Sequence, residues 1–332
     1  MTAAIKVAET RAGSRIVAIG SYLPRRVVTN AEMCTMIDST DEWIQQRTGI
    51  KERRWAGDDE QVQDMAYGAA TQALSRAGMT AADIDCVIVA TVSYTVQTPA
   101  LAPLVAAQLG CVDAAAYDVS AACAGFCYSL AQADSLIRTG SATNVLVIGV
   151  ERLSDITDKS DRGTAFLFAD GAGAAVVSPS DVPGIGPVVW GSDGAQAGAL
   201  KQSEDFRVAS PKGYMPTLEM DGKAVFLWAT TFIAGAARRV LEKSGVSAHD
   251  LDVFVPHQAN NRITDSMLRH LKLPEHVVVA RAIERIGNTS AASVPLAMDE
   301  LLTSGQARSG QTALIIGFGA GLAYAGQVVT LP

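Results

Sequence analysis

The sequence lacks the features that mark several large classes of protein. Its 332 residues contain no long low-complexity tract and only five cysteines, which are unevenly spaced. An odd, scattered set of cysteines does not build a disulfide framework and is typical of a reducing setting. Residues 1–13 are polar and lack the apolar core of a signal peptide. We therefore expect a cytoplasmic protein.

Long hydrophobic runs and excess positive charge are also missing. The most apolar late stretch, residues 312–326, carries four glycines and is too short to span a membrane. The net charge of −7 argues against nucleic-acid binding. An acidic partner would have to meet basic residues that are gathered locally, and Arg262 and Arg269, two helical turns apart, are one such pair.

What the sequence does contain is a large apolar fraction, 48% of the residues. That fraction predicts a large core, in one big domain or in two fused halves. Strand-like and helical patterns alternate, which predicts βαβ units with mixed sheets covered by helices. The expected elements include strands over 15–22, 85–91 and 144–150, a helix over 61–77 and a hairpin over 164–178.

The second half of the chain echoes the first. Asp85 and Asp252 precede similar apolar strands and lie 167 residues apart, and Ile148 and Ile316 lie 168 apart in a second similar pair. Two matches at nearly one spacing predict an internal duplication. The proline- and glycine-rich segment 179–187 is the expected boundary. The predicted halves are residues 1–183 and 184–332.

Cys123 lies where a strand-like run ends in small residues and a helical pattern begins. Free N–H groups and the helix dipole favour an anion at a helix N-terminus, so we expect a lowered thiol pKa and a nucleophile. Cysteine is also commonly a small core residue, which is our interpretation of Cys127 and the other three. Two cysteines four residues apart make a poor zinc pattern, and we expect no metal.

The duplication supplies candidate partners for this thiol. The spacing of 167 carries Cys123 onto Ser290, beside Asn288, where small polar residues again open a helix. His257 follows the strand that begins at Asp252. Strand ends that face helix N-termini are where α/β sheets hold ligands. Two halves packed about a pseudo-twofold axis should bring the thiol, imidazole and carboxamide to one cavity.

These three groups suit acyl transfer. A thiolate can take an acyl group as a thioester, and an imidazole beside an amide can donate to an oxygen that becomes negative. The glycines of the loop 317–321 permit close approach of backbone N–H groups. A cysteine hydrolase with the same three side chains remains an alternative. A non-catalytic binding protein would require their loss.

Four short motifs follow one another along the chain: Ala122–Gly125, Pro256–Asn260, Gly287–Ser290 and Gly317–Gly321. Together with the stretches Ser39–Ile50 and Asp161–Gly163, they resemble β-ketoacyl-acyl-carrier-protein synthase III, a family of the thiolase superfamily that starts bacterial fatty-acid synthesis. The likeness runs from about residue 15 to 332 and implies a thiolase-like α/β fold of duplicated βαβ halves, layered α-β-α-β-α with two mixed sheets.

The resemblance implies a two-step Claisen condensation. Cys123 would take an acyl group from acyl-CoA, and malonyl-acyl-carrier protein would then lose carbon dioxide with His257 and Asn288 stabilising the enolate. The backbone N–H groups of Cys123 and Ala320 match the oxyanion hole. The family uses no cofactor beyond these substrates. A pathway-specific relative that primes polyketide synthesis, or that acylates another acceptor, stays open.

The resemblance also assigns binding residues. Trp43 and Arg162 match the pair that sandwiches the adenine of CoA, and Arg47 matches a phosphate contact. Arg262 and Arg269 match positions for carrier-protein docking.

The chain departs from relatives at two positions. Leu227 stands where some relatives have another basic docking residue. Thr98 stands where several relatives have phenylalanine, at a position contributed across a homodimer interface to the acyl pocket. The smaller threonine predicts that branched or longer primers are accepted as well as acetyl.

Overall fold

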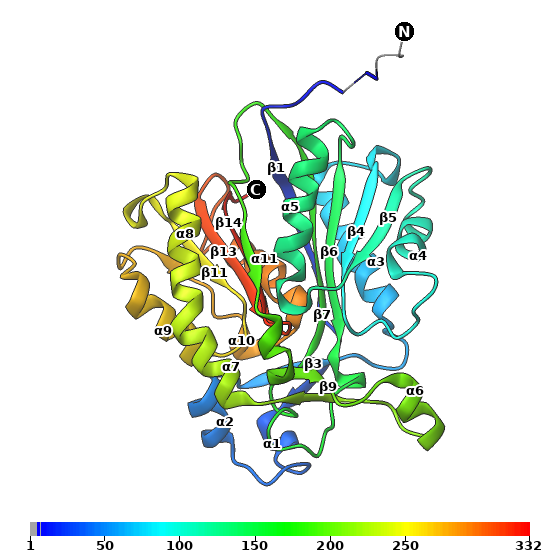
Figure 1. Cartoon of the computed structure of the whole chain (residues 1–332), viewed down its shortest axis with the longest axis vertical. Coiled ribbons are helices and arrows are strands. Elements are labelled where there is room, and N and C mark those ends of the chain that lie inside the picture. The colour runs from blue at the N-terminus through cyan, green and yellow to red at the C-terminus, as the bar shows by residue number, and fades with distance from the viewer. Residues whose placement is uncertain (1–4, 7) are drawn as a thin grey trace.

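Two five-stranded sheets form the frame of the computed structural model, which describes residues 5–6 and 8–332 (Figure 1). In the first sheet the order is β1-β7-β6-β4-β5, and β4 runs parallel to β5 and β6 whereas β7 runs antiparallel to β1 and β6. Its strands are β1 (Gly13–Tyr22), β4 (Cys86–Ala90), β5 (Ala115–Val119), β6 (Val145–Arg152) and β7 (Asp170–Ser180).

The second sheet repeats this mixed pattern in the order β12-β11-β13-β14-β8. Here β11 runs parallel to β12 and β13, and β14 runs antiparallel to β13 and β8. The shared pattern confirms the predicted duplication. The strands are β8 (Val189–Ser192), β11 (Val253–Pro256), β12 (Val278–Val279), β13 (Thr312–Gly319) and β14 (Ala323–Thr330).

Helices fill the space between the sheets and cover their outer faces. α5 (Gly125–Arg138) and α11 (Ser293–Thr303) lie between the sheets, and their apolar side chains join one core with both. α3 (Val62–Ala77) and α4 (Leu101–Leu109) cover the first sheet, and α8 (Ala234–Ser244) and α9 (Asn261–Leu271) cover the second. This confirms the predicted α-β-α-β-α layering.

Shorter elements gather at one end of the layers, at the bottom of Figure 1. Most of them share a separate apolar cluster that includes Met33, Ile44, Trp55 and Phe166. The elements are β2 (Arg26–Thr29), β3 (Glu52–Trp55), β9 (Leu200–Gln202), β10 (Leu218–Met220), α1 (Asn30–Met33), α2 (Asp41–Thr48), α6 (Phe206–Ala209), α7 (Gly222–Trp228) and α10 (Ile283–Ile286).

The predicted hairpin over 164–178 is wrong. Residues 164–167 form turns, and β7 is one continuous strand from Asp170. The reason is a long-range contact, because Ala169 N–H donates to Asn288 O and Asn288 N–H donates to Leu167 O, each at 2.9 Å. The segment before β7 is therefore tied to the second half and not to a neighbouring strand.

The boundary between halves stays a prediction. The first sheet uses residues 13–180 and the second uses residues 189–330. Hydrogen bonds nevertheless join Gly184 to both sides, since its N–H donates to Ser14 O and its carbonyl accepts from Thr330 N–H, each at 2.8 Å.

One helical segment of the described chain, Gly222–Ser244, is long and apolar enough to cross a membrane by length and composition. It comprises α7, a π-helical turn and α8. Its apolar residues, among them Trp228, Ile233 and Val240, pack in the cluster over the second sheet. The segment thus serves as the outer helical layer of the fold.

Candidate active site

Cys123 sits in a tight elbow between β5 and α5. It belongs to the 3₁₀ turn Ala122–Ala124, and Ala122 has a left-handed φ of 45°. The backbone of β13 passes directly over it, because a Cβ added at Gly319 would lie 2.7 Å from Cys123 Sγ. A Cβ at Gly317 would lie 2.7 Å from Cys123 O. Only glycine permits this approach, as the loop motif predicted.

The thiol pKa moves opposite to the expectation. Burial raises the pKa of Cys123 to about 11, against the weaker lowering effects of the Ser290 hydroxyl and the N–H groups of Cys123 and Ala320. The residue is only 6% exposed, so the loss of hydration outweighs the effect of its position before a helix. The resting group is therefore a thiol, and acyl transfer requires a proton acceptor.

His257 is a neutral imidazole whose orientation is fixed by Ser293. Burial lowers the pKa of His257 to about 3, so the ring is uncharged at neutral pH. Its Nδ1 lies 2.6 Å from Ser293 Oγ, which also accepts from Gln258 N–H at 3.3 Å. The serine hydroxyl can donate its proton to Nδ1 while its oxygen accepts that N–H. In this arrangement the neutral imidazole carries its own proton on Nε2.

Asn288 presents the amide end of its side chain. Its Oδ1 accepts the N–H of Ser290 at 2.9 Å, which leaves the NH₂ group as the free donor. The backbone of Asn288 forms a bridge with Phe168, just before β7. This contact between the halves holds the carboxamide in place.

The three predicted residues line one narrow cavity of about 70 Å³. The backbone N–H groups of Cys123 and Ala320 both lower the pKa of the thiol, and their role as oxyanion donors stays a prediction. Most of the side chains that line the cavity are apolar. The cavity is lined by Cys123, Leu167, Phe168, Leu200, Met220, Gly222, Val225, Phe226, His257, Ala259, Asn260, Ile263, Asn288, Phe318 and Gly319.

The residues predicted to hold CoA form one cluster. The Arg162 guanidinium carbon lies 5.1 Å from the centroid of the Trp43 ring, and that of Arg47 lies 5.5 Å from it. Trp43 also makes an edge contact with Phe166, at 5.3 Å between centroids. Both arginines are exposed, and the indole between them is half-buried. The structure brings the three together; their role toward CoA stays a prediction.

Arg262 and Arg269 are exposed on α9, as predicted for a docking surface. The Arg262 guanidinium carbon lies 4.9 Å from the ring centroid of Phe226, which lines the cavity. Arg262 therefore lies at the cavity's edge. Leu227, next to that phenylalanine, is 61% exposed.

Thr98 is not brought to this cavity within one chain. It is exposed in the loop before α4 and is absent from the cavity lining. Its predicted role requires a second copy of the chain and stays a prediction. Among the described residues no group of three or more His, Cys, Asp or Glu side chains is placed to hold a metal.

Sequence reasoning missed Ser293 and Glu151 and gave Ser290 no role of its own. Ser293 lies against the imidazole, Ser290 lies in the turn that packs beside the Cys123 turn, and Glu151 is fully buried at the end of β6. The available signals were the two serines in the stretch 287–293 and a single carboxylate at the end of an apolar strand.

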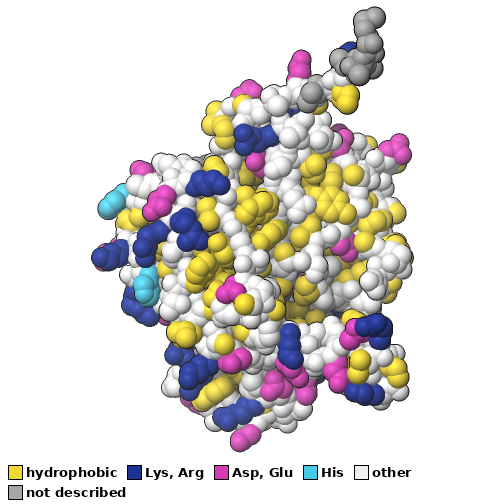
Figure 2. Space-filling model, viewed as in Figure 1, with side chains coloured by type: hydrophobic (Ala, Val, Ile, Leu, Met, Phe, Trp, Pro, Cys, Tyr) yellow, Lys and Arg dark blue, Asp and Glu magenta, His cyan; other side chains and the backbone are white. Residues whose placement is uncertain are grey.

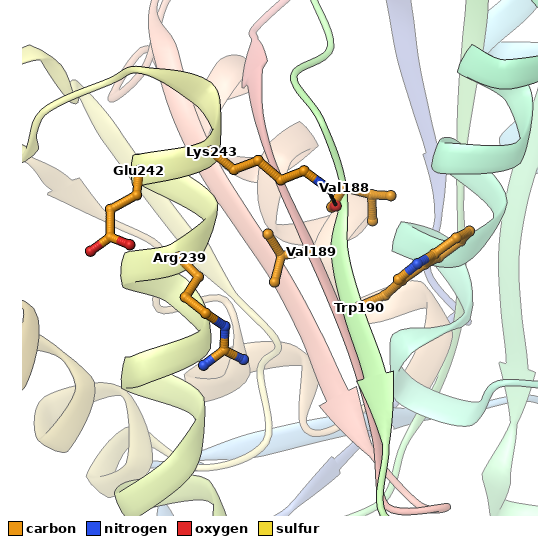
Figure 3. Close-up of a pocket in the computed structure, with 6 residues that line it drawn as sticks. All are labelled: Val188, Val189, Trp190, Arg239, Glu242 and Lys243. Carbon is orange, nitrogen blue, oxygen red and sulfur yellow. Dashed lines mark hydrogen bonds between the residues drawn. The ribbon is translucent and has the colours of Figure 1, made fainter.

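A wider groove lies elsewhere and holds no nucleophile. Its volume is about 540 Å³, and it runs between α8 and the edge strand β8 (Figure 3). In that groove the Lys243 ammonium donates to Val188 O at 3.1 Å. Its lining residues are Val188, Val189, Trp190, Arg239, Glu242 and Lys243.

The duplicated two-sheet fold, with a cysteine buried against a neutral histidine and a carboxamide, defines a thiolase-like condensing enzyme. Comparison with known proteins narrows the class. Residues 117–194 match the model of the 3-oxoacyl-[acyl-carrier-protein] synthase III family, and residues 241–331 match its C-terminal model.

Relatives that match over the whole chain point to the same family as the two partial matches. The β-ketoacyl-[acyl-carrier-protein] synthase III of Streptomyces glaucescens is 54% identical over 331 residues, 99% of each chain. The Mycobacterium tuberculosis enzyme is 51% identical and covers 97% of this chain and 98% of its own. The priming β-ketosynthase of the R1128 polyketide pathway superposes with a TM-score of 0.96 at 52% identity, covering 99% and 98%. The chain belongs to the β-ketoacyl-[acyl-carrier-protein] synthase III family and is a condensing acyltransferase.

Proposed function

We propose that this enzyme condenses an acyl-CoA primer with malonyl-acyl-carrier protein to give a 3-ketoacyl-carrier protein. The observation that carries the proposal is the convergence of Cys123, His257 and Asn288 on one narrow cavity. Family membership supplies the substrate classes. The reaction starts a fatty-acid chain and takes place in the cytoplasm.

In the first step the sulfur of Cys123 attacks the acyl carbonyl and CoA leaves as a thiolate. The N–H groups of Cys123 and Ala320, which both lower the pKa of the thiol, stabilise the oxygen of the tetrahedral intermediate. Apolar walls such as Leu167 and Phe318 keep water from the thioester. This exclusion favours condensation over the alternative of hydrolysis.

In the second step the malonyl thioester loses carbon dioxide. The Nε2–H of His257 and the NH₂ of Asn288 donate to the carbonyl oxygen that becomes an enolate. A neutral imidazole suits this role, because burial keeps its pKa near 3 and it donates without giving up its proton. The carbanion then attacks the acyl-Cys123 thioester and expels the sulfur.

Charge on the surface supports the choice of substrates. Figure 2 shows Lys and Arg side chains gathered on the side of the molecule that carries α8 and α9. The exposed pair Arg262 and Arg269 would meet an acidic carrier protein there, despite the net charge of −7. Trp43 and Arg162 would separate to take an adenine between them, with Arg47 on a phosphate.

We further propose a homodimer that completes the acyl pocket. β5 is an edge strand with half-exposed Tyr117 and Val119, and Figure 2 shows hydrophobic side chains gathered over the face that carries α5 and β5. Pairing there would carry Thr98 toward the partner's site. A Thr98→Phe variant should then restrict the primer to acetyl, and sedimentation should report two chains.

Priming of polyketide synthesis is a second candidate. It is favoured by the likeness to the R1128 priming β-ketosynthase, whose TM-score of 0.96 is higher than the 0.88 of the synthase III from Aquifex aeolicus. Both candidates share the chemistry and differ in the carrier protein that accepts the product.

The test is intact-mass spectrometry after incubation with acetyl-, isobutyryl- and longer acyl-CoA. We expect an acyl adduct on Cys123 that disappears when malonyl-carrier protein is added, with a 3-ketoacyl product. Parallel reactions with fatty-acid and polyketide carrier proteins separate the two candidates. Release of free acid without carrier protein would show a hydrolase and overturn the proposal.

A further inference from the structure

Glu151 is a buried carboxylate near the thiol, and the mechanism above does not use it. It is fully buried at the end of β6. One oxygen, Oε2, accepts from Ser93 Oγ at 2.6 Å, from Val92 N–H at 3.1 Å and from Thr91 Oγ1 at 3.3 Å. The other oxygen, Oε1, is buried without a hydrogen-bond partner. A buried acceptor left unpaired is costly and calls for an explanation.

The turn that carries Ser290 lies between the strand of this carboxylate and the turn of the thiol. A Cβ added at Gly125, directly after the Cys123 turn, would lie 3.6 Å from Ala291 Cβ. The Ser290 hydroxyl lowers the pKa of both Cys123 and Glu151. Its Oγ has no partner of hydrogen-bond geometry in the resting structure. The turn that carries it is packed on β6, because a Cβ at Gly149 would lie 2.4 Å from Ala291 O.

The backbone at Ser290 is strained. Ser290 has a left-handed φ of 46°, which is strained for a residue with a Cβ, and strain of this kind collects at functional sites. Its N–H is held by Asn288 Oδ1 at 2.9 Å. The same turn therefore fixes the carboxamide donor and the hydroxyl beside the thiol.

The geometry points to a proton relay in which Glu151, acting through the Ser290 hydroxyl, takes the thiol proton of Cys123 when the acyl group is transferred. The relay rests on the proposed function, since acyl transfer is the step that it serves. His257 is a poor candidate for this task, because its pKa is lowered to about 3 whereas burial raises the pKa of Glu151 to about 7.

Each proton that is moved in the first step is accounted for by the end of the second. As the bond from Sγ to the acyl carbon forms and the carbon–sulfur bond to CoA breaks, the thiol proton passes to Ser290 Oγ and the serine proton to Glu151. The CoA thiolate takes a proton from water as it leaves. When condensation expels the Cys123 thiolate, Glu151 returns its proton through Ser290.

Among the described residues, the groups that hydrogen-bond to this carboxylate are all uncharged. Facing it are hydroxyls and backbone amides from residues 91–93 after β4, Ser290 and Ala291 from the turn before α11, and the thiol of Cys123. Of these groups only the thiol titrates. The wild-type acylation rate should therefore rise with pH through the pKa of Glu151, about 7.

The test compares Glu151→Gln with wild type in rapid-quench acylation by acetyl-CoA, read by intact mass. We expect at least a tenfold slower acylation at pH 7.5 and loss of the rise near pH 7. Decarboxylation of malonyl-carrier protein by the same variant should be unchanged. Asp134→Asn is the matched control, because it removes a half-buried carboxylate whose pKa is also raised by burial, toward the far end of α5.

Ser290→Ala should slow acylation as Glu151→Gln does, and the double variant should be no slower than either. Iodoacetamide should still alkylate Cys123 in all of them, which checks that the pocket is intact. The relay would be overturned if either single variant acylated at the wild-type rate or faster. It would also be overturned if the losses of the two single variants multiplied in the double variant, or if a variant lost acylation and decarboxylation together. A wild type that takes no acyl-CoA would instead contradict the proposed function.

Discussion

Ala122 and Ser290 hold the same left-handed backbone conformation, with φ of 45° and 46°, at positions 168 residues apart. Each opens a 3₁₀ turn that leads into a central helix, α5 or α11. The equivalent of Cys123 is therefore Ala291, and not Ser290 as the spacing of 167 predicted. The duplication made two matching elbows, one with the nucleophile and one with the hydroxyl that faces it.

The first prediction separates acylation at Cys123 from decarboxylation by His257 and Asn288. Cys123→Ala should give no acyl-enzyme, whereas decarboxylation of malonyl-carrier protein should persist, because its donors are His257 and Asn288. Cys127→Ala is the control, since that thiol is buried in the core one turn later. The measurements are intact mass and carbon dioxide release. An acyl adduct on the Cys123 variant would refute the assignment of the nucleophile.

Ser293 gives a second prediction. Ser293→Ala removes the hydroxyl 2.6 Å from His257 Nδ1, so the Nε2–H tautomer loses its support. A lost buried hydrogen bond is worth about 1 kcal/mol, and we expect decarboxylation to slow by roughly fivefold to tenfold. Ser293→Thr should retain most of the rate. Nitrogen NMR of the imidazole would report the tautomer directly.

The matched control for that variant is Ser266→Ala, which removes a hydroxyl 3.5 Å from the Nδ1 of His270 on α9. This histidine lies outside the cavity, and its variant should decarboxylate at the wild-type rate. Equal losses in both variants would mean that Ser293 acts through general stability.

The motifs found the nucleophile and both donors because each motif is local in sequence. The glycines that pass over Cys123 and the histidine that follows a strand can each be identified from the residues next to them in the sequence. The neighbours of Ser293 and Glu151 along the chain do not indicate their roles. Ser293 acts on His257, 36 positions away, and Glu151 affects Cys123, 28 positions away. Tertiary contact, not local pattern, defines them.

Burial and tertiary contacts also account for the predictions that were wrong. The thiol pKa was predicted from a helix terminus, which is visible in sequence, but burial dominates it and is a property of the folded chain. The hairpin over 164–178 was predicted from turn residues, but Asn288 captures the backbone of residues 167 and 169. Strands and helices such as β1, α3, β4 and β6 were placed within two residues of their observed bounds.

Buried carboxylates give a third prediction, on stability. Burial raises the pKa of Glu151 from 4.5 to about 7 and that of Asp170 from 3.8 to about 6. Between these values both carboxyls hold protons in the folded state that the unfolded state has released. His257 acts in the opposite direction, because burial lowers its pKa from 6.5 to about 3. Two groups outweigh one, so the free energy of unfolding should fall as pH rises from about 4 to about 7.

Urea unfolding at pH 5 and pH 8 measures this slope. Glu151→Gln should flatten it, and its stability relative to wild type should be higher at pH 8 than at pH 5. A wild type that gains stability over this pH range would contradict the prediction.

Gly319 gives the last prediction, because its lack of a side chain lets β13 pass over the thiol. Gly319→Ala would place a Cβ 2.7 Å from Cys123 Sγ and 2.9 Å from Cys123 Cβ. Overpacking of this kind costs about 1–3 kcal/mol of stability, and blocking the attack should slow acylation by roughly a hundredfold or more.

Gly235→Ala is the matched control, since nothing lies within 4 Å of its added Cβ in α8. That helix should gain about 0.5–1 kcal/mol with acylation unchanged, because alanine favours a helix over glycine. Acyl uptake by intact mass and the urea midpoint test both variants, and a Gly319→Ala enzyme that acylates at the wild-type rate would mean that the strand does not cover the sulfur during attack.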